Sequence, residues 1–205
     1  MADKQFLKDV YGLKSVADTK ALYDEWSDTY DSEVASNGYV TPKRIADALA
    51  ELINDKSQPI LDFGCGTGIS GQALKMAGFN VIDGCDLSQA MLDHAANKNT
   101  YRRLWQIAPD GEKAIVTGAY GAIAAIGVIS IGAAPPETMD GLISALAPGG
   151  LFAFSFNDHT LEDPQFEARV AHHLNTGSCS EVLRRSGEHL PGIGLGSTIY
   201  ILKRL

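Results

Sequence analysis

A glycine-rich turn directly after a short apolar segment constrains the fold of this chain more than any other feature. The turn lies in Leu61-Asp-Phe-Gly-Cys-Gly-Thr-Gly68, and the apolar residues before its glycines predict a buried strand over 59–63. Residues 71–77 then favour a helix that Gly78 ends. Glycine lets the backbone turn sharply and approach a bound molecule closely. The pattern therefore predicts a strand–turn–helix unit whose helix points its first N–H groups toward the turn.

The rest of the chain alternates between helical and strand patterns. The first 40 residues predict two short helices and a loop, the better helix being 17–30. Further helices are expected at 42–54, 88–99, 136–146 and 163–174, and further strands at 80–85, 103–107, 120–126, 151–156, 181–188 and 198–203. Parallel strands need helical crossovers, whereas the last two strands have no helix between them and should pair as a hairpin. We therefore expect a Rossmann-like α/β fold: a mostly parallel seven-stranded sheet with one antiparallel strand and helices on both faces.

Capping residues mark two of the helix starts. Thr41-Pro42 predicts a helix with Thr41 as its cap and proline at its first position. Ser88 is expected to cap the helix that follows the second strand. The first of these starts suggests a division of the chain into an N-terminal helical lid segment, 1–40, and a ligand-binding domain, 41–205.

The charge pattern argues against a polyanionic partner. The chain of 205 residues has 17 Lys and Arg against 25 Asp and Glu, a net charge of −8. Its densest basic spots are pairs, which predict solvated surface: Lys43/Arg44, Arg102/Arg103 and Arg184/Arg185. A patch assembled from these pairs in space stays open. We expect a small-molecule partner and no nucleic acid; the oligomeric state is left open, with a monomer favoured.

Three further patterns bear on the compartment. The N-terminus lacks a secretory signal, and the longest apolar run, 119–134, is shorter than the roughly 20 residues of a membrane span. Cys65, Cys85 and Cys179 have no paired spacing, which predicts free thiols, the first two buried, and no metal site. These patterns indicate a cytoplasmic protein without a membrane partner.

Two carboxylates near the turn bear on the ligand. Asp86 follows Gly66 by 20 residues at the end of the second strand, where it can accept hydrogen bonds from the ribose of an adenosine ligand. Residues 66–71 also match the G-x-G-x-x-G pattern of dinucleotide sites. Asp62 would repel a pyrophosphate but attract the ammonium of a methionyl group. S-adenosylmethionine is therefore favoured over a dinucleotide, and a turn that binds no ligand is the third interpretation.

Several motifs together resemble a known family. Asp62-x-Gly-x-Gly-x-Gly68, Asp86-Leu-Ser-Gln-Ala-Met-Leu92 and Pro148-Gly-Gly150 resemble class I S-adenosylmethionine-dependent methyltransferases. More narrowly, the chain is similar to the methyltransferase-like proteins named for Williams–Beuren syndrome chromosome region 27, on the segments 22–31, 127–130, 135–137 and 154–158. The resemblance spans about residues 20–205. It implies the methyltransferase fold and S-adenosyl-L-methionine as cofactor, without a substrate.

The resemblance also implies which residues hold the cofactor. Backbone of the turn would contact the methionyl end, Asp86 the ribose, and the side chains that follow it the adenine. The residues so assigned are Gly64, Cys65, Gly66 and Gly68, with Ile126 and Gly127, for the methionyl side, and Leu87 and Met91 for the adenine. Met91 is also interpretable as a core residue of its helix. The family often has an acidic residue after the third strand, where this chain has Ala108, preceded by Gln106 and Ile107. Adenine recognition would then fall to the main chain, to Gln106 or to Asp110.

Aromatic residues in the N-terminal segment have two interpretations. Tyr23, Trp26 and Tyr30 are spaced three and four residues apart and so share one helix face. The face is either a core-facing stripe or, as the resemblance implies, a lid over the cofactor with Tyr30 nearest the methionyl carboxylate or sulfonium. Both can hold together.

The expected activity is methyl transfer to a small molecule, in which the protein mainly aligns the reactants. A general base is needed only for a poor nucleophile, and the weak candidates are Asn157, Asp158 and His159. The last two are equally interpretable as a helix cap and a loop residue, and His94, His172 and His173 are expected at the surface. The alternative functions are a non-catalytic or regulatory S-adenosylmethionine-binding protein and a dinucleotide-dependent oxidoreductase.

Overall fold

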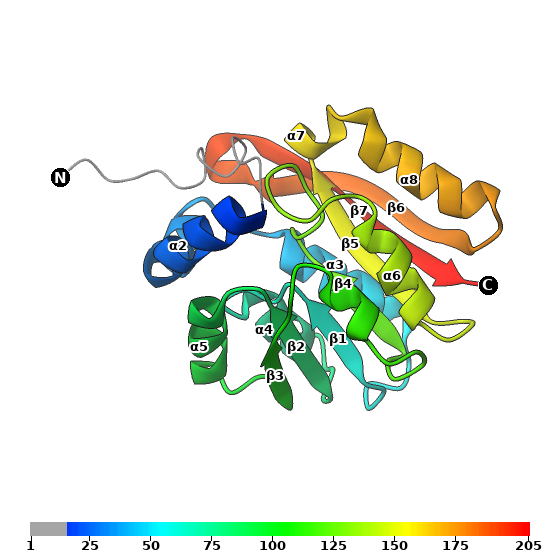
Figure 1. Ribbon diagram of the computed structural model, residues 1–205, viewed down its shortest axis with the longest axis horizontal. Helices are drawn as coiled ribbons and strands as arrows, with labels where there is room; N and C mark the ends of the chain where they lie inside the picture. The colour runs from blue at the N-terminus through cyan, green and yellow to red at the C-terminus, as the bar shows by residue number, and fades with distance from the viewer. Residues whose placement is uncertain (1–15) are drawn as a thin grey trace.

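Seven strands form one sheet in the order β3-β2-β1-β4-β5-β7-β6 in a computed structural model that describes residues 16–205 (Figure 1). The strands are β1 (Ile60–Phe63), β2 (Ile82–Asp86), β3 (Arg103–Gln106), β4 (Ala122–Ala125), β5 (Leu151–Asn157), β6 (Cys179–Leu190) and β7 (Leu195–Arg204). Strands β1 to β5 pair in parallel, and β7 runs antiparallel to both β5 and β6. The expected seven-stranded sheet with one antiparallel strand is confirmed.

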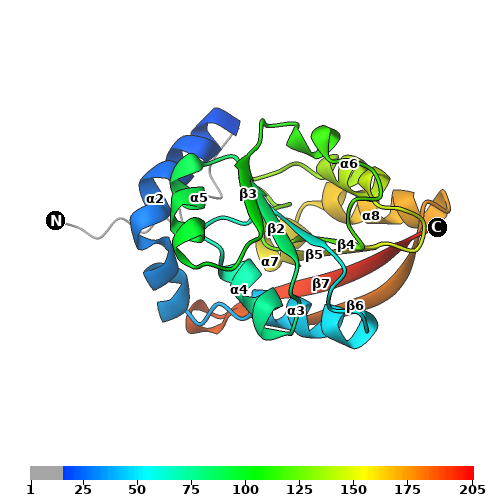
Figure 2. The same cartoon turned by 90° about the horizontal axis from the view of Figure 1, so that it is seen from below.

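Helices cover both faces of the sheet, with α3 and α4 on one side and α6 and α8 on the other (Figure 2). The helices are α2 (Val16–Ser36), α3 (Thr41–Leu52), α4 (Ile69–Met76), α5 (Gln89–Asn97), α6 (Thr138–Ala145), α7 (Asp158–Leu161) and α8 (Pro164–Asn175), with short 3-10 turns η2 (Gly111–Ala114) and η3 (Pro191–Ile193). Helices α2 and α5 lie side by side at the β3 edge of the sheet in both views. Within residues 16–205, none of the helices combines the length and apolar character needed to cross a bilayer.

The core consists of two apolar layers, one on each face of the sheet. On strand β5, Phe152, Phe154 and Phe156 point to the α6 and α8 side, while Ala153 points to the α3 side. This division follows from the two-residue period of a strand. Ala122 and Ala124 of β4 also face α3, so small side chains let that helix pack closely against the sheet.

The local differences from the expected elements have physical reasons. Helix α2 runs to Ser36 as a single helix, longer than expected because its aromatic face packs on the domain. Strand β2 starts at Ile82, since the pairing with β1 begins there. The predicted cap at Thr41 is wrong: that residue lies inside α3, and its hydroxyl bonds His189 and Ser197 at 2.8 and 3.0 Å.

Other local predictions are confirmed. Ser88 caps α5 by accepting a hydrogen bond from the Met91 N–H at 3.1 Å. All three cysteines are buried and free. Of the two short helices expected in the first 40 residues, the described part contains one, α2, and residues 1–15 lie outside the described range. The division of the chain at residue 40 stays a prediction.

Candidate functional site

A cavity lies at the carboxyl ends of the central strands, between the sheet and α2. It contains about 1060 Å³ of empty space when the solvent at its opening is included. Its walls comprise Lys20, Tyr23, Tyr30, Tyr39, Pro42, Phe63, Gly64, Cys65, Gly66, Thr67, Ile69, Ser70, Asp86, Leu87, Ser88, Met91, Ile107, Pro109, Ile126, Gly127, Val128, Ala133, Ala134, Pro135 and Thr138.

The cavity residues follow the order of the strands across the sheet. Ile107 follows β3, Asp86 and Leu87 end β2, the turn at 63–67 ends β1, and Ile126 follows β4. In an open α/β sheet this edge is where ligands bind. The site therefore has a β3–β2 end, a centre at the glycine turn and a β4 end.

Three glycines shape the turn after β1. Gly64, Gly66 and Gly68 have positive φ angles of 67°, 52° and 91°, which side chains other than glycine adopt at a cost. The N–H groups of Gly64 and Cys65 both donate to the Cys85 carbonyl, at 2.9 and 3.0 Å. A Cβ on Gly64 would lie 2.5 Å from the Val128 side chain. The turn is thus held against β2 and closely approached from the β4 side.

Asp86 connects this turn to the next one. Its Oδ2 accepts the Gly66 N–H at 2.8 Å, and its Oδ1 accepts the Ser88 N–H at 2.9 Å. Burial raises the pKa of this carboxyl despite these bonds. A carboxylate has about four lone-pair positions, so Asp86 keeps acceptor capacity toward the cavity.

Asp62 lies behind the cavity wall. It is fully buried, and its Oδ2 accepts the Ser70 and Tyr101 hydroxyls at 2.6 and 2.7 Å. Its Oδ1 has no hydrogen-bond partner among the described residues. Burial raises the pKa of Asp62 to about 6. Asp62 does not line the cavity itself, but Ser70, which bonds it, does.

The titration of Asp62 predicts a pH-dependent stability. Because its pKa in the folded state, about 6, exceeds its ordinary 3.8, the folded state binds the proton more tightly. The favourable contribution of Asp62 to the free energy of unfolding is therefore complete below its ordinary pKa and is lost as pH rises through about 6. We expect the stability of Asp62→Asn relative to wild type to increase by up to about 3 kcal/mol between about pH 4 and 7.

Urea unfolding of both proteins across this range measures the difference. Asp83→Asn is the control: burial raises the Asp83 pKa, but hydrogen bonds from Arg102, Tyr120 and Arg103 outweigh it and hold the pKa below its ordinary 3.8, so the difference from wild type should stay nearly constant between about pH 4 and 7. A difference between Asp62→Asn and wild type that does not vary with pH contradicts the assignment.

Tyr101 supports the turn from behind and was missed by the sequence analysis. Besides bonding Asp62, its hydroxyl accepts the Gly71 N–H at 3.2 Å. A Cβ on Gly84 would lie 2.8 Å from its ring, and one on Gly68 would lie 3.1 Å from it. Gly68, expected at the methionyl end, thus packs on Tyr101 and does not line the cavity.

Helix α2 covers the cavity with two of its three predicted aromatic residues. Tyr23 and Tyr30 line the cavity, and burial raises the pKa of Tyr30 well above its usual value. Trp26 is buried instead, stacked on Tyr23, with its indole N–H donating to Glu33 at 2.7 Å. One face of this helix therefore both lines the cavity and packs into the core, and its role as a lid over a cofactor stays a prediction.

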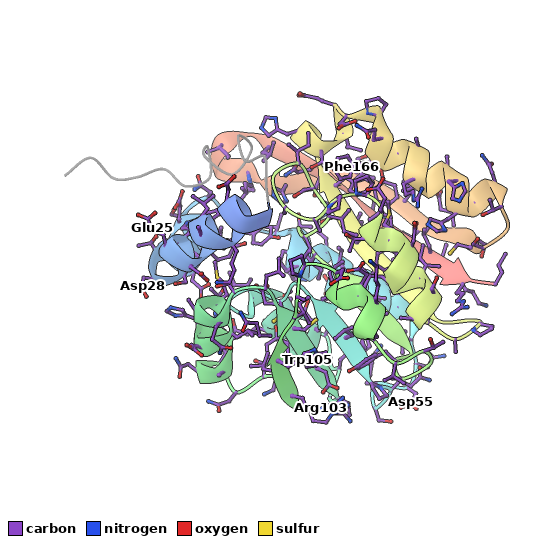
Figure 3. All side chains as sticks on the ribbon, in the orientation of Figure 1. Glu25, Asp28, Asp55, Arg103, Trp105 and Phe166 are labelled. Atoms are coloured by element: carbon purple, nitrogen blue, oxygen red, sulfur yellow. The ribbon has the colours of Figure 1, made fainter. Side chains whose placement is uncertain are left out.

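Acidic residues on α2 fasten it to the domain. Asp24 accepts the Ser88 hydroxyl, and Asp31 accepts the Thr67 hydroxyl. Asp31 also pairs with Lys98 at 2.5 Å, and Asp28 lies 3.2 Å from His94 (Asp28 is labelled on α2 in Figure 3). Two of these partners, Thr67 and Ser88, are themselves cavity residues, so the position of α2 is coupled to the cavity wall.

Of the remaining residues expected to contact adenine, one lines the cavity and the others do not. Ile107 lines the cavity, whereas the Gln106 amide donates to the Leu87 carbonyl at 2.8 Å. Ala108 and Asp110 line a shallow depression beside Trp105 rather than the cavity. The side chains of Leu87, Met91 and Ile107 thus form the apolar part of the β3–β2 end.

The three weak base candidates do not line the cavity. Asn157 caps α7 through the Thr160 N–H at 2.9 Å, and Asp158 accepts the Gly196 N–H at 2.7 Å. His159 lies beside Glu162 at 3.9 Å. Asn157 ends β5 and the other two residues begin α7, and β4 separates β5 from β1 and the glycine turn that follows it. Within residues 16–205, no cluster of His, Cys, Asp or Glu is arranged to hold a metal ion.

The histidine expectations need one correction. His173 is not at the surface: it is buried, and its Nε2 bonds Asp140 at 2.8 Å. Adjacent histidines lie on different helix faces, so His172 is exposed while its neighbour packs inward. His189, which the sequence did not single out, is buried against the Tyr39 ring, and burial together with Arg44 lowers its pKa to about 4.

Comparison with known proteins agrees with this architecture. A family model described as a methyltransferase domain matches residues 37–190. Methyltransferase-like protein 27 from Homo sapiens is 31% identical over 145 residues, which are 69% of this chain and 58% of that protein. The chain therefore spans less than two thirds of the length of this relative.

Two solved structures share the fold at low sequence identity. A methyltransferase in complex with the Haloferax volcanii Trm112 methyltransferase activator has a TM-score of 0.64 at 14% identity, covering 87% of this chain and 96% of that one. Magnesium protoporphyrin IX methyltransferase from Synechocystis PCC 6803, solved with bound SAM, has a TM-score of 0.59 at 17% identity, covering 98% and 90%. From the family model, which matches most of the chain, and from the human relative, we conclude that the chain belongs to the methyltransferase domain family.

Proposed function

We propose that the cavity binds S-adenosylmethionine and that the protein transfers its methyl group to a small molecule. The observation that carries the proposal is the strand-ordered cavity, in which Asp86 and the glycine turn lie side by side at the carboxyl edge of the sheet. The buried carboxyl of Asp62 lies behind this turn and accepts the hydroxyl of the cavity residue Ser70, so its negative charge would favour a cationic methionyl group in the cavity.

Different residues of the cavity would bind the ribose, the adenine and the methionyl group of the cofactor. Asp86 would accept the ribose hydroxyls, and Leu87, Met91 and Ile107 would enclose the adenine. The backbone at 64–66 would hold the methionyl group, with Ile126 and Gly127 on its far side. Tyr30, adjacent to the Asp31–Thr67 bond, would close this end from α2.

S-adenosylmethionine supplies an activated methyl group when bound. What the chain supplies is orientation and the exclusion of water, because α2 covers the cavity and its tyrosines form part of the wall. Asn157, Asp158 and His159 have structural contacts outside the cavity, which favours a mechanism without a base from these residues.

A ligand panel tests the cofactor. A specific ligand raises the melting temperature by mass action, so S-adenosylmethionine should stabilise the protein while NAD and FAD should not. Stabilisation by a dinucleotide alone would favour an oxidoreductase. Binding without any methylated product, in a mass-shift assay with methyl-labelled cofactor and a metabolite extract, would favour a regulatory binding protein.

The lid arrangement predicts a difference in hydrogen exchange. Helix α2 contacts the domain through a small apolar cluster and polar bonds, so its amides should exchange faster than those of α3 without ligand. S-adenosylmethionine should slow this exchange and change the emission of Trp26. Asp31→Ala should speed it, whereas Asp47→Ala, which removes a pair confined to α3, should leave it unchanged. Exchange of 16–36 that is equally slow with and without ligand would argue against a lid.

The arrangement of basic residues predicts weak binding to polyanions. Arg102 and Arg103 both pair with buried Asp83, and Arg184 pairs with Glu181 and Glu167. Figure 3 shows Arg103 at the start of β3, remote from α2. Cations engaged in this way have little free charge for phosphates. We expect no retention on heparin and no binding to mixed RNA at physiological salt; salt-sensitive binding at micromolar protein would favour a macromolecular acceptor.

A further inference from the structure

The β4 end of the cavity differs chemically from the rest of the site. We propose that it binds an uncharged, predominantly apolar molecule, and that this is the class of the methyl acceptor. The second part rests on the proposed function, because the β4 end serves the acceptor only if the cofactor occupies the glycine turn and the β3–β2 end.

A folded-back loop forms the wall of this pocket. We define the β4 pocket by Pro42, Val128, Ala133, Ala134, Pro135 and Thr138, with Tyr39 beside it. Gly127 turns the chain with a φ of 72°, and the Ala134 N–H donates to the Val128 carbonyl at 2.9 Å. Val128 packs against Gly64, where an added Cβ would lie 2.5 Å away. The pocket therefore adjoins the turn that the methionyl group would occupy.

Charged side chains lie at the other end of the cavity. Among the described residues that line it, the formally charged ones are Lys20 and Asp86. Lys20 pairs with Asp24 at 2.5 Å, and Asp24 bonds Ser88, which places this pair at the β3–β2 end. Asp86 belongs to the same end through its bond to Ser88. A charged group in the β4 pocket would lose hydration without gaining a counter-ion, which is costly.

Neutral hydroxyls supply the polarity of the β4 pocket. The Tyr39 hydroxyl lies beside Gly127, where an added Cβ would be 2.8 Å away. Its ring packs edge-on to His189 with centroids 5.1 Å apart, and His189 in turn bonds the Thr41 hydroxyl. The lowered pKa keeps this imidazole neutral at pH 7. Tyr39 and Thr138 can thus orient one polar atom of a ligand whose remainder contacts alkyl groups.

Three probes of one size test the charge preference. Benzyl alcohol, benzoate and benzylammonium are titrated by ligand-observed NMR into the full chain saturated with S-adenosylhomocysteine. We expect benzyl alcohol to bind at least about tenfold more tightly than either ion, since an unpaired buried charge costs more than 1.4 kcal/mol. Ala133→Asp should reverse the preference toward benzylammonium, and the exposed Ala147→Asp should leave it unchanged.

Each result decides between the two proposals. Calorimetric binding of S-adenosylhomocysteine is measured first, and its absence would overturn the proposed function. If that ligand binds but an ion binds as tightly as benzyl alcohol, or none of the probes binds, the inference about the β4 pocket is overturned alone. It is also overturned if Ala133→Asp leaves the order of affinities unchanged.

Discussion

Replacement of Asp86 by alanine is expected to weaken S-adenosylmethionine binding by about 30- to 1000-fold, a loss of about 2–4 kcal/mol. The ribose would lose the two charge-assisted hydrogen bonds that it would donate to the Asp86 carboxylate. The carboxylate's bonds to the Gly66 and Ser88 N–H groups would be lost as well, so the two turns that it connects would be less well organised for the ligand. Isothermal titration calorimetry measures the change directly.

Asp83→Asn is a matched control for this result. Asp83 lies on the same strand and is fully buried, but its partners are Arg102, Arg103 and Tyr120, and it does not line the cavity. Its replacement should lower the melting temperature without a comparable loss of affinity. A weakening of less than about threefold in Asp86→Ala would mean that other groups hold the ribose.

Gly71→Ala is expected to lower the free energy of unfolding by about 2 kcal/mol, although alanine normally favours a helix over glycine by about 1 kcal/mol. Gly71 lies in α4, and its added Cβ would come closer than 3.0 Å to the Tyr101 ring and hydroxyl. Displacement of Tyr101 would remove a hydrogen bond from Asp62, whose other oxygen already has no partner among the described residues. Urea unfolding monitored by circular dichroism measures the change.

A double-mutant cycle separates this clash from other effects. In the Tyr101→Ala background, Gly71→Ala should be neutral or stabilising, because the obstructing ring is gone. Ala73→Gly on the same helix should cost about 1 kcal/mol in either background. Equal destabilisation by Gly71→Ala with and without Tyr101 would show that the ring is not the cause.

The sequence predicted best those site residues that directly follow a strand recognisable from its local pattern. Asp86 and Leu87 end up beside the turn at 64–66 because parallel strands bring their carboxyl ends to one edge of the sheet. The expectation about Asn157 placed it at the correct edge but not in the cavity, since strand order across the sheet is a long-range property. Tyr39 and Thr138 reach the cavity through a loop and a helix start whose positions no local pattern encodes.

Tyr101 shows a second kind of limit. Its position before β3 carries no motif, and its role follows from three glycines on other elements, Gly68, Gly71 and Gly84, which leave room for its ring. The vacant space beside a glycine could have suggested a large partner, but not which residue supplies it. Likewise, Trp26 shares a helix face with Tyr23 and Tyr30, and only the packing shows which ring faces the cavity.

The position of β7 between β5 and β6 has a consequence for synthesis. A growing chain that has reached residue 190 contains all of β6, but β7, the strand that joins it to the sheet, is still to be made. At that stage β5 has an open edge, a template for pairing with other chains. Residues 195–204 then pair with both strands. A delay before β7 leaves the ribosome would therefore prolong a state prone to misassembly and open to chaperone capture, and pairing of β7 with β5 and β6 would end it.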